Sequence, residues 1–398
     1  MGVLVVQHVP GEGPYAIREA LTAAGLSVEV CRVWAGDGLP QSLQGHEALV
    51  VTSGPMGAAR DDGFPTRDAE LRLLREALAA EVPLLGVCLG ARLLAVAAGG
   101  VARAGTGVQA DRSEVLLTPW AGHDLLFRGM AGRWGASHCH GDGVELPDGA
   151  VSLAARARYP AQAFRVGGAA WGLQFHPEAE GTSAPSRDRV FGRFAALVAA
   201  RAPHTATRTF FTPRADAWET RFAADGPRYA EAVALMGLRP GRTVLDLGCG
   251  SGRALPALRM AVGAAGTVLG LDVTSAMLVA AAREGRRGPA SLLAADCMRL
   301  PLPPGAVHGI FTAGLLDHLP DPGAALHEWA RVTAPDGVLL LFHPSGRVER
   351  AARHGRPLTP DDPLAEPNLR PMLDASGFEL VRYEDAREHF LARAVRAR

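Results

Sequence analysis

Short apolar runs alternate with amphipathic stretches along the first half of the chain. The runs Val3–Val6, Ser27–Cys31 and Ala48–Val51 predict buried strands. The stretches Ile17–Ala24 and Ala69–Ala80 place apolar residues at helical spacing and predict helices. Strands that alternate with helices favour a parallel sheet with helices on both faces. The first half is therefore expected to be a doubly wound α/β domain.

The same alternation returns in the second half. One or two helices are expected within Trp218–Met236. Five apolar runs then predict buried strands: Thr243–Leu247, Thr267–Leu271, Ser291–Leu293, Val307–Thr312 and Val338–Phe342. The segments Phe378–Tyr383 and Phe390–Val395 predict a closing pair of strands. The second half is therefore expected to be another α/β domain.

The joint between the halves is indicated by a change in pattern. An amphipathic helix is expected over Ser186–Arg201, and the segment 202–213 that follows has the Pro and Thr content of a linker. We therefore expect domains at 1–201 and 214–398, joined by a linker at 202–213.

Charge and cysteine usage narrow the class of partner. The 398 residues include 41 Lys plus Arg and 41 Asp plus Glu, so there is no basic field for nucleic acid, and small-molecule partners are expected. The five cysteines are widely and irregularly spaced. They form neither a disulfide framework nor a zinc pattern, so we expect a cytoplasmic protein without a metal site. No apolar run reaches the length of a membrane span, so no membrane partner is expected.

One cysteine, Cys88, occupies a position that is typical of a catalytic nucleophile. Cys88 stands in PLLGVCLGARLL, where an apolar strand must turn into a helix, and Gly86 and Gly90 flank it. A nucleophile on such a turn is pushed outward on a strained backbone, and the helix N-terminus favours its thiolate. The alternative is a buried structural cysteine. If Cys88 attacks a carbonyl, the backbone N–H groups of Gly54 and Leu89 are candidates for the oxyanion hole, although the TSGP stretch at 52–55 is also compatible with an ordinary turn.

A candidate base lies far downstream. The stretch AFRVGGAAWGLQFHPE predicts two strands around a glycine turn and ends at His176 and Glu178. A thiolate that attacks an amide needs a base for its proton, and the base needs a group that fixes its tautomer. His176 can be the base, and Glu178, two residues on, can be the orienting carboxylate.

Together these motifs resemble the class I, or triad, glutamine amidotransferase domain, closest to its GMP-synthase-like members. The resemblance covers residues 1 to 200 and implies a flavodoxin-like fold. It also implies that Cys88 forms a γ-glutamyl thioester and releases ammonia with the help of His176 and Glu178. The sequence departs from the family at one position, because Arg92 stands where the family carries a Gln that touches the substrate glutamine. The substrate class is therefore glutamine or another γ-glutamyl compound.

A glycine loop opens the second sheet. The motif DLGCGSG spans 246–252, and its alternating glycines Gly248, Gly250 and Gly252 let the backbone turn tightly beneath a nucleoside. A nicotinamide fold would need its third glycine at 253, where this chain has Arg. Carboxylates follow three of the expected strands, at Asp246, Asp272 and Asp296, and Cys297 follows the last of them. These positions suit the ribose and adenine of a nucleoside cofactor.

These residues resemble those of a class I S-adenosylmethionine-dependent methyltransferase, with a Rossmann-like, seven-stranded sheet. The resemblance implies S-adenosyl-L-methionine as cofactor, bound by the seven residues 246, 248, 250, 252, 272, 296 and 297. If the methyl acceptor is an O–H or N–H group, Asp317 and His318 are the candidate bases, and His343 is the next candidate. Each of the three can equally be structural. The arginines of the segment 344–371 form either a basic lid or a solvated charge run.

The sequence thus predicts a bifunctional enzyme, with an amidohydrolase half and a methyltransferase half. Ammonia needs an electrophile that is usually made with ATP, and the chain has no GxxxxGK[ST] loop to supply one. The first half is therefore expected to cleave a γ-glutamyl amide from an intermediate that the second half methylates, or to serve a separate synthetase. Two alternatives remain: a catalytically silent amidotransferase-like module, or a nicotinamide enzyme in the second half.

Overall fold

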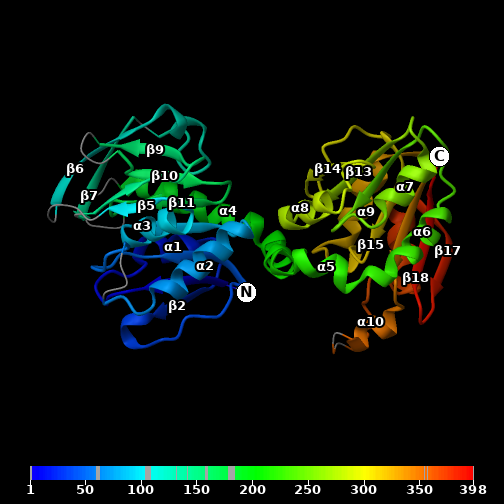
Figure 1. Cartoon of the computed structure of the whole chain (residues 1–398), viewed down its shortest axis with the longest axis horizontal. Helices are drawn as coiled ribbons and strands as arrows, with labels where there is room; N and C mark the ends of the chain where they lie inside the picture. Colours follow the sequence, from blue (N-terminus) through cyan, green and yellow to red (C-terminus); the bar gives the residue numbers. More distant parts are fainter. Residues whose placement is uncertain are drawn as a thin grey trace. The chain divides into compact units, whose positions relative to one another are not determined.

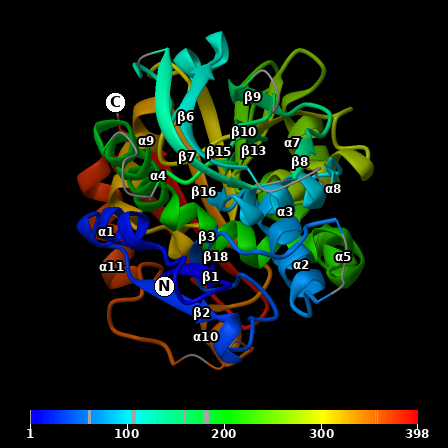
Figure 2. The same ribbon diagram turned by 90° about the vertical axis from the view of Figure 1, so that its left-hand side faces the viewer.

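The computed structural model describes residues 2–59, 63–103, 109–130, 132–140, 142–156, 160–177, 184–353, 355 and 357–397. The chain divides into two compact units, Met1–Phe210 and Phe211–Arg398. Each unit is an α/β structure built around one large sheet (Figures 1 and 2). The fold class predicted from the alternation of elements is therefore confirmed.

The sheet of the first unit is mixed. Its strands, in spatial order, are β2 (Val28–Arg32), β1 (Gly2–Gln7), β3 (His46–Val51), β4 (Leu84–Val87), β11 (Ala170–Leu173), β10 (Ala163–Val166), β9 (Val151–Ala155), β6 (Gln109–Leu117) and β7 (Arg133–His140). The pairs from β2 to β11 are parallel and the pairs from β11 to β7 are antiparallel. The prediction of a parallel sheet is thus right for the half that carries Cys88. A separate antiparallel pair joins β5 (Val101–Arg103) to β8 (Gly143–Glu145).

Alternation along β1 explains the two layers of helices in this unit. Val3 and Val5 face a core shared with α1 (Tyr15–Ala23) and α4 (Ala184–Phe211). Leu4 and Val6 face a second core, shared with α2 (Arg67–Ala79) and α3 (Leu89–Ala97). The sheet is therefore covered on both faces.

The predicted linker is helical over most of its length. Helix α4 passes through Pro203 and ends at Phe211, and a 3₁₀ turn follows at Thr212–Arg214. Two threonine hydroxyls donate to backbone carbonyls one turn earlier, Thr205 to Arg201 at 3.1 Å and Thr209 to Thr205 at 3.0 Å. Threonine side chains that bond back within a helix are compatible with helical structure, which composition alone does not reveal.

The second unit contains the predicted seven strands. In spatial order they are β14 (Ser291–Ala294), β13 (Thr267–Asp272), β12 (Thr243–Leu247), β15 (Val307–Ala313), β16 (Thr333–His343), β18 (Phe390–Arg396) and β17 (Phe378–Asp385). Only the pairs that involve β18 are antiparallel. Because β12 is the first strand of this unit and the later strands β13 and β15 lie on opposite sides of it, the strand order reverses there, which is where ligands bind in such sheets.

Helices cover both faces of this sheet as well. One core includes α6 (Gly226–Ala234) and α7 (Leu255–Val262), and the other includes α9 (Pro322–Val332) and α11 (Glu366–Ser376). The remaining helices are α5 (Ala215–Arg221), α8 (Ser275–Arg283) and α10 (Arg347–Arg353). Strand β16 begins five residues before the predicted start at Val338 and continues through residues 335–337 with a left-handed Asp336 at φ 62°.

Gly90 provides a test of how tightly the Cys88 turn packs. A Cβ atom at Gly90 would collide with the carbonyl oxygen of Val51 on β3. We expect Gly90→Ala to lower the free energy of unfolding by about 3 kcal/mol or more, because backbone rather than a flexible side chain must move. Denaturant unfolding measures this.

Gly192 is the matched control. It lies on the exposed side of α4 with nothing within 4 Å of an added Cβ. Gly192→Ala should raise the free energy of unfolding by up to about 1 kcal/mol, because alanine has the higher helix propensity. Equal effects of the two substitutions would contradict the tight packing of the turn.

Candidate active sites

Cys88 occupies a strained turn between β4 and α3. Its backbone lies at φ 51° and ψ −100°, a region that residues with a Cβ rarely adopt and that costs roughly 1 to 3 kcal/mol. The residue is 2% exposed and caps the N-terminus of α3. A Cβ at Gly86 would collide with the backbone carbonyl of Gly90, so both glycines are needed for the turn to close. The strand-to-helix turn predicted around Cys88 is thus present, and it holds the sulfur at the positive end of a helix.

Strand β11 brings the QFHPE motif to the same sheet edge. It pairs in parallel with β4, and Leu173 lies opposite Val87. The Cys88 N–H donates to the Leu173 carbonyl at 2.7 Å, and Gln174 Nε2 lies 3.8 Å from Cys88 Sγ as a donor. His176 follows two residues later, and its backbone N–H donates to the Ser137 carbonyl at 2.9 Å. Topology therefore delivers the segment with His176 beside the cysteine turn. Glu178 lies outside the described residues.

Arg92 lies close to the cysteine sulfur. Its guanidinium NH2 is 4.0 Å from Cys88 Sγ, and its NH1 is 2.5 Å from the carboxylate of Asp142. Arg92 is 5% exposed, so this ion pair is largely removed from water. The residue that departs from the amidotransferase pattern therefore belongs to the immediate surroundings of the thiol.

Gly54 packs closely against the side chains of Leu89 and His8. A Cβ at Gly54 would lie 3.0 Å from Leu89 Cδ2 and 2.9 Å from His8 Cβ, so a larger residue would crowd both. Among the residues that the structure describes, neither the Gly54 N–H nor the Leu89 N–H donates to an acceptor. Two such donors beside a nucleophile can bind an oxygen that becomes negative.

Sequence reasoning missed four residues around this site. They are Gln174, Asp142, His8 and Glu70. Gln174 and His8 could have been found, because each directly follows a strand that ends at the chemical edge of the sheet. Asp142 and Glu70 could not, because no motif or spacing connects either of them to a partner so far away in the chain.

The glycine loop of the second unit follows β12. Gly248, Gly250 and Gly252 all have left-handed φ angles, of 64°, 54° and 79°. Only glycine adopts such a series without strain, so the loop turns tightly at the end of the strand. Because β12, β13 and β14 are neighbours in parallel, Asp246, Asp272 and the residues after Ala294 reach one edge of the sheet.

Burial controls the protonation of Asp246. The residue is 2% exposed, and burial, reinforced by the charge of Asp272, raises the pKa of its carboxyl well above the ordinary value. In the ligand-free protein this pair therefore resists carrying two negative charges. A cationic ligand group beside Asp246 would favour the ionised carboxylate and so lower the pKa of Asp246 again.

The other acidic residues contact the backbone. Asp272 accepts from Gly250 N–H at 2.9 Å and from Thr274 N–H at 2.8 Å, and Asp296 accepts from Met298 N–H at 2.8 Å. The Cys297 carbonyl accepts from Trp329 Nε1 at 3.0 Å, and burial raises the pKa of the Cys297 thiol to about 12. The glycine cradle and this acidic edge fit a nucleoside that carries positive charge.

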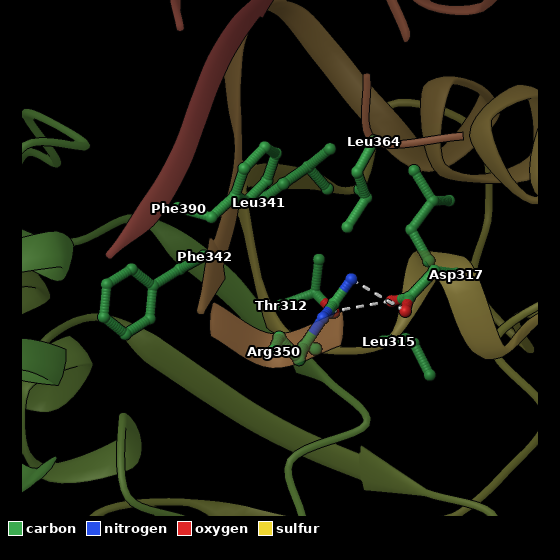
Figure 3. Close-up of a pocket in the computed structure, with 10 residues that line it drawn as sticks. Thr312, Leu315, Asp317, Leu341, Phe342, Arg350, Leu364 and Phe390 are labelled. Carbon is green, nitrogen blue, oxygen red and sulfur yellow. Dashed lines mark hydrogen bonds and ion pairs between the residues drawn. The ribbon is translucent and has the colours of Figure 1, made fainter. Parts of the chain in front are cut away.

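A small pocket opens beside this edge (Figure 3). Its wall is largely apolar and includes Leu341, Phe342, Leu364 and Phe390. Its polar side is an ion pair, in which Arg350 NH2 lies 2.9 Å from Asp317 Oδ2. His318 is exposed and is not among the residues that line this pocket. Asp317 can therefore face a ligand, but only in competition with Arg350.

His343 lies at the end of β16, against Gly314 of the same pocket. A Cβ at Gly314 would lie 3.1 Å from His343 Cδ2. Burial, with a smaller contribution from the positive charge of Arg350, lowers the pKa of His343 to about 4. At neutral pH this imidazole is uncharged, and Nδ1 lies within hydrogen-bond distance of the backbone N–H and carbonyl of Ser345.

The low pKa of His343 predicts a pH dependence of stability. The unfolded side chain titrates near 6.5 and the folded one near 4, so the unfolded state binds more protons between these values. The free energy of unfolding should therefore fall as the pH drops from about 6.5 to 4, by up to about 3 kcal/mol from this group. His343→Asn keeps a polar atom near Ser345 and should remove this contribution. Denaturant unfolding at several pH values tests it, and identical pH profiles for the two proteins would contradict it.

Three arginines of the 344–371 segment are held by partners within the unit, and Arg356 lies outside the described residues. Arg347 lies 2.8 Å from Asp362, Arg350 pairs with Asp317, and Arg353 NH2 donates to Ser345 Oγ at 2.6 Å. Much of the positive charge seen in the sequence is therefore compensated locally. The segment does not present these three guanidinium groups as a solvated charge run.

In the described part of the chain, no helix is long and apolar enough to cross a membrane. No group of three or more His, Cys, Asp or Glu side chains among the described residues is arranged to hold a metal ion.

The fold and the two sites together define an α/β protein with a cysteine turn in one unit and a nucleoside-type glycine loop in the other. Residues 14–193 match the family model described as glutamine amidotransferase class-I, and residues 245–341 match the one described as a methyltransferase domain. The chain therefore combines a class-I glutamine amidotransferase domain with a methyltransferase domain.

Relatives match parts of the chain. An uncharacterized 37.1 kDa protein in transposon TN4556 of Streptomyces fradiae is 38% identical over 123 residues, 30% of this chain and 36% of the relative. The glutamine-hydrolyzing GMP synthase of Porphyromonas gingivalis is 31% identical over 150 residues, 37% of this chain and 28% of the relative. The putative glutamine amidotransferase-like protein YfeJ of Salmonella typhimurium is 28% identical over 182 residues, 45% of this chain and 76% of the relative. The chain thus spans about a third of the length of the first two relatives.

Proposed function

We propose that the first unit is a thiol amidohydrolase acting on glutamine or another γ-glutamyl compound. Cys88 Sγ attacks the γ-carbonyl carbon, His176 accepts the thiol proton and returns it to the leaving nitrogen, and the amide C–N bond breaks. Water then attacks the γ-glutamyl thioester and frees the sulfur as γ-carboxylate forms. Glu178 orients His176, and the N–H groups of Gly54 and Leu89 hold the oxyanion. The strained turn of Cys88, with Gln174 of the QFHPE motif beside its sulfur, is the observation that carries this proposal.

The position of Arg92 bears on which γ-glutamyl compound is the substrate. In the resembling family this position carries a neutral amide that touches glutamine, whereas here a buried guanidinium lies beside the sulfur. We propose that a γ-glutamyl compound whose leaving group differs from ammonia suits the site around Cys88 at least as well as glutamine does. The same ion pair also supports the second candidate, a silent binding module, because Arg92 and Asp142 occupy space near the nucleophile.

We propose that the second unit is a methyltransferase that uses S-adenosyl-L-methionine. The glycines of the loop would pass beneath the cofactor, Asp246 would face its cationic part, Asp272 the ribose, and Asp296 with the Cys297 backbone the adenine. The bound cofactor supplies the methyl group. The chain's own contribution is to hold donor and acceptor in line and to exclude water, so no single residue need be catalytic.

The acceptor site is proposed to be the pocket that Leu341, Phe342, Leu364 and Phe390 line. Its apolar wall would contact an apolar part of the acceptor, and Asp317 can remove a proton from an O–H or N–H acceptor only after its ion pair with Arg350 opens. His318 and His343 are the other candidate bases; His343 is uncharged at neutral pH, and its pKa of about 4 makes it the weaker base.

Two relations between the activities fit the chemistry. Methyl transfer consumes no ammonia, so the first unit either removes a γ-glutamyl group from a compound that the second unit methylates, or supplies ammonia to a separate synthetase. Both versions require glutamate release by the first unit.

Three assays on the purified protein test the proposal. Release of ammonia from glutamine and of glutamate from a panel of γ-glutamyl amides tests the first unit, and absence of both would leave the silent module. Calorimetric titration with S-adenosylhomocysteine against NADH tests the second unit, and preference for NADH would refute it. A cell extract treated with the protein and methyl-labelled S-adenosylmethionine should yield a labelled small molecule.

A further inference from the structure

A second histidine and carboxylate lie behind the candidate oxyanion loop. His8 follows β1 and Glu70 lies on α2, and the two side chains are 0% exposed. His8 Nε2 is 2.8 Å from Glu70 Oε2, and His8 Nδ1 is 3.2 Å from the carbonyl oxygen of Ser53. The Thr66 hydroxyl donates to Glu70 Oε1 at 2.7 Å, and the His8 ring packs edge-on against Phe64 at 5.8 Å. Every side of the imidazole is thus held.

These contacts fix the protons. A carbonyl oxygen only accepts, so Nδ1 must carry the hydrogen that it shares with Ser53. The other ring nitrogen, Nε2, shares a hydrogen bond with the Glu70 carboxylate. Glu70 therefore ensures that His8 presents an N–H donor to Ser53.

The Ser53 carbonyl belongs to the same peptide unit as the Gly54 N–H. The described chain contains no cis peptide bond, so in this planar trans unit the carbonyl and the N–H point in opposite directions. A hydrogen bond that fixes the direction of the carbonyl also fixes the direction of the N–H on the far side. Because Nδ1 of His8 contacts the carbonyl oxygen, the N–H on the opposite side of this unit is held away from the imidazole.

We propose that His8, held by Glu70, is a positioning residue for the oxyanion hole. Its Nδ1–H holds the Ser53–Gly54 peptide so that the Gly54 N–H is directed toward the oxygen that becomes negative when Cys88 attacks a γ-glutamyl carbonyl. This inference rests on the amidohydrolase function proposed above. Because the negative charge develops only during the reaction, the contribution of His8 falls on kcat rather than on KM.

The test uses two variants of the full chain. His8→Phe keeps a ring of similar shape without a donor, and His8→Asn places an amide N–H near the position of Nδ1. We expect His8→Phe to lower kcat for γ-glutamyl hydrolysis roughly ten- to hundredfold with KM nearly unchanged, and His8→Asn to recover most of the loss. A γ-aldehyde analogue of glutamine, whose adduct with Cys88 carries the oxyanion, should lose affinity for His8→Phe by the same factor as kcat/KM.

Each outcome decides a separate question. Equal kcat in the wild-type protein and in folded His8→Phe, or a loss confined to KM, would overturn the positioning role while leaving the amidohydrolase function intact. A wild-type protein that neither hydrolyses a γ-glutamyl compound nor binds the aldehyde would instead refute the amidohydrolase function. If His8→Phe does not fold, nitrogen NMR of the wild-type protein decides: Nδ1 of His8 must be protonated, and an unprotonated Nδ1 overturns the proposal.

Discussion

Cys88→Ala should abolish hydrolysis of γ-glutamyl compounds by the full-length protein, with a fall in kcat of about 10⁴-fold or more. The reason is that the described side chains Gln174 and Arg92, which contact the Cys88 sulfur, are an amide and a guanidinium, and neither can replace the thiol as nucleophile. Cys88→Ser should be nearly as inactive, because a hydroxyl is a much weaker nucleophile than a thiolate. The measurement is steady-state release of glutamate.

Cys31 offers the matched control. It is a buried cysteine of the same unit, 6% exposed, and its sulfur contacts the carbonyls of Asp37 and Gly38. Cys31→Ala should retain the wild-type kcat. Loss of activity in Cys31→Ala, or full activity in Cys88→Ala, would show that the nucleophile has been assigned incorrectly.

Asp246→Asn should make the ligand-free protein more stable and unable to bind its cofactor. Burial and the charge of Asp272 raise the pKa of Asp246, so the folded state binds more protons than the unfolded state above pH 3.8. Its contribution to stability is therefore lost as the pH rises through the raised pKa, and the ionised group is a cost at neutral pH. The amide removes that cost, and we expect the free energy of unfolding to rise by on the order of 1 kcal/mol.

Asp246→Asn should weaken cofactor binding although it stabilises the ligand-free protein. A cationic ligand group gains from an ionised Asp246 and gains little from an amide, so we expect the affinity for S-adenosylmethionine to fall by about 10²-fold. Asp374→Asn, an exposed position on α11, makes the same charge change away from the loop and should alter neither quantity by more than about 0.5 kcal/mol. A destabilised Asp246→Asn protein that still binds the cofactor would contradict the role assigned to this carboxylate.

The helices and strands could be predicted wherever burial requires a regular pattern of apolar residues in the sequence. Apolar runs mark the strands of both sheets because parallel strands are buried on both faces. The β7 strand escaped notice because RWGASHCH has neither a continuous apolar run nor clean alternation. The helical segment through Pro203 was not predicted because threonine and proline are typical of linkers, although α4 continues through Pro203 and the Thr205 hydroxyl donates to the Arg201 carbonyl one turn earlier.

The candidate sites were predictable only as far as their chemistry lies within short motifs. Cys88, Gly54 and the glycine loop stand at strand ends, where a sequence pattern places them without knowledge of tertiary contacts. Arg92 was recognisable as a departure, but its pairing with Asp142, fifty positions away, depends on how the chain folds. The same is true of His8 and Glu70, which are 62 positions apart.

The most direct test of the central claim is to look for the acyl-enzyme itself. The wild-type protein is mixed with glutamine and, separately, with other γ-glutamyl amides, quenched in acid within the first turnover, digested and analysed by mass spectrometry. The account predicts one γ-glutamyl group on the peptide that contains Cys88, removable by hydroxylamine as a thioester should be. A γ-glutamyl group on a different residue, or none from any of these compounds in a protein that is folded, would contradict it.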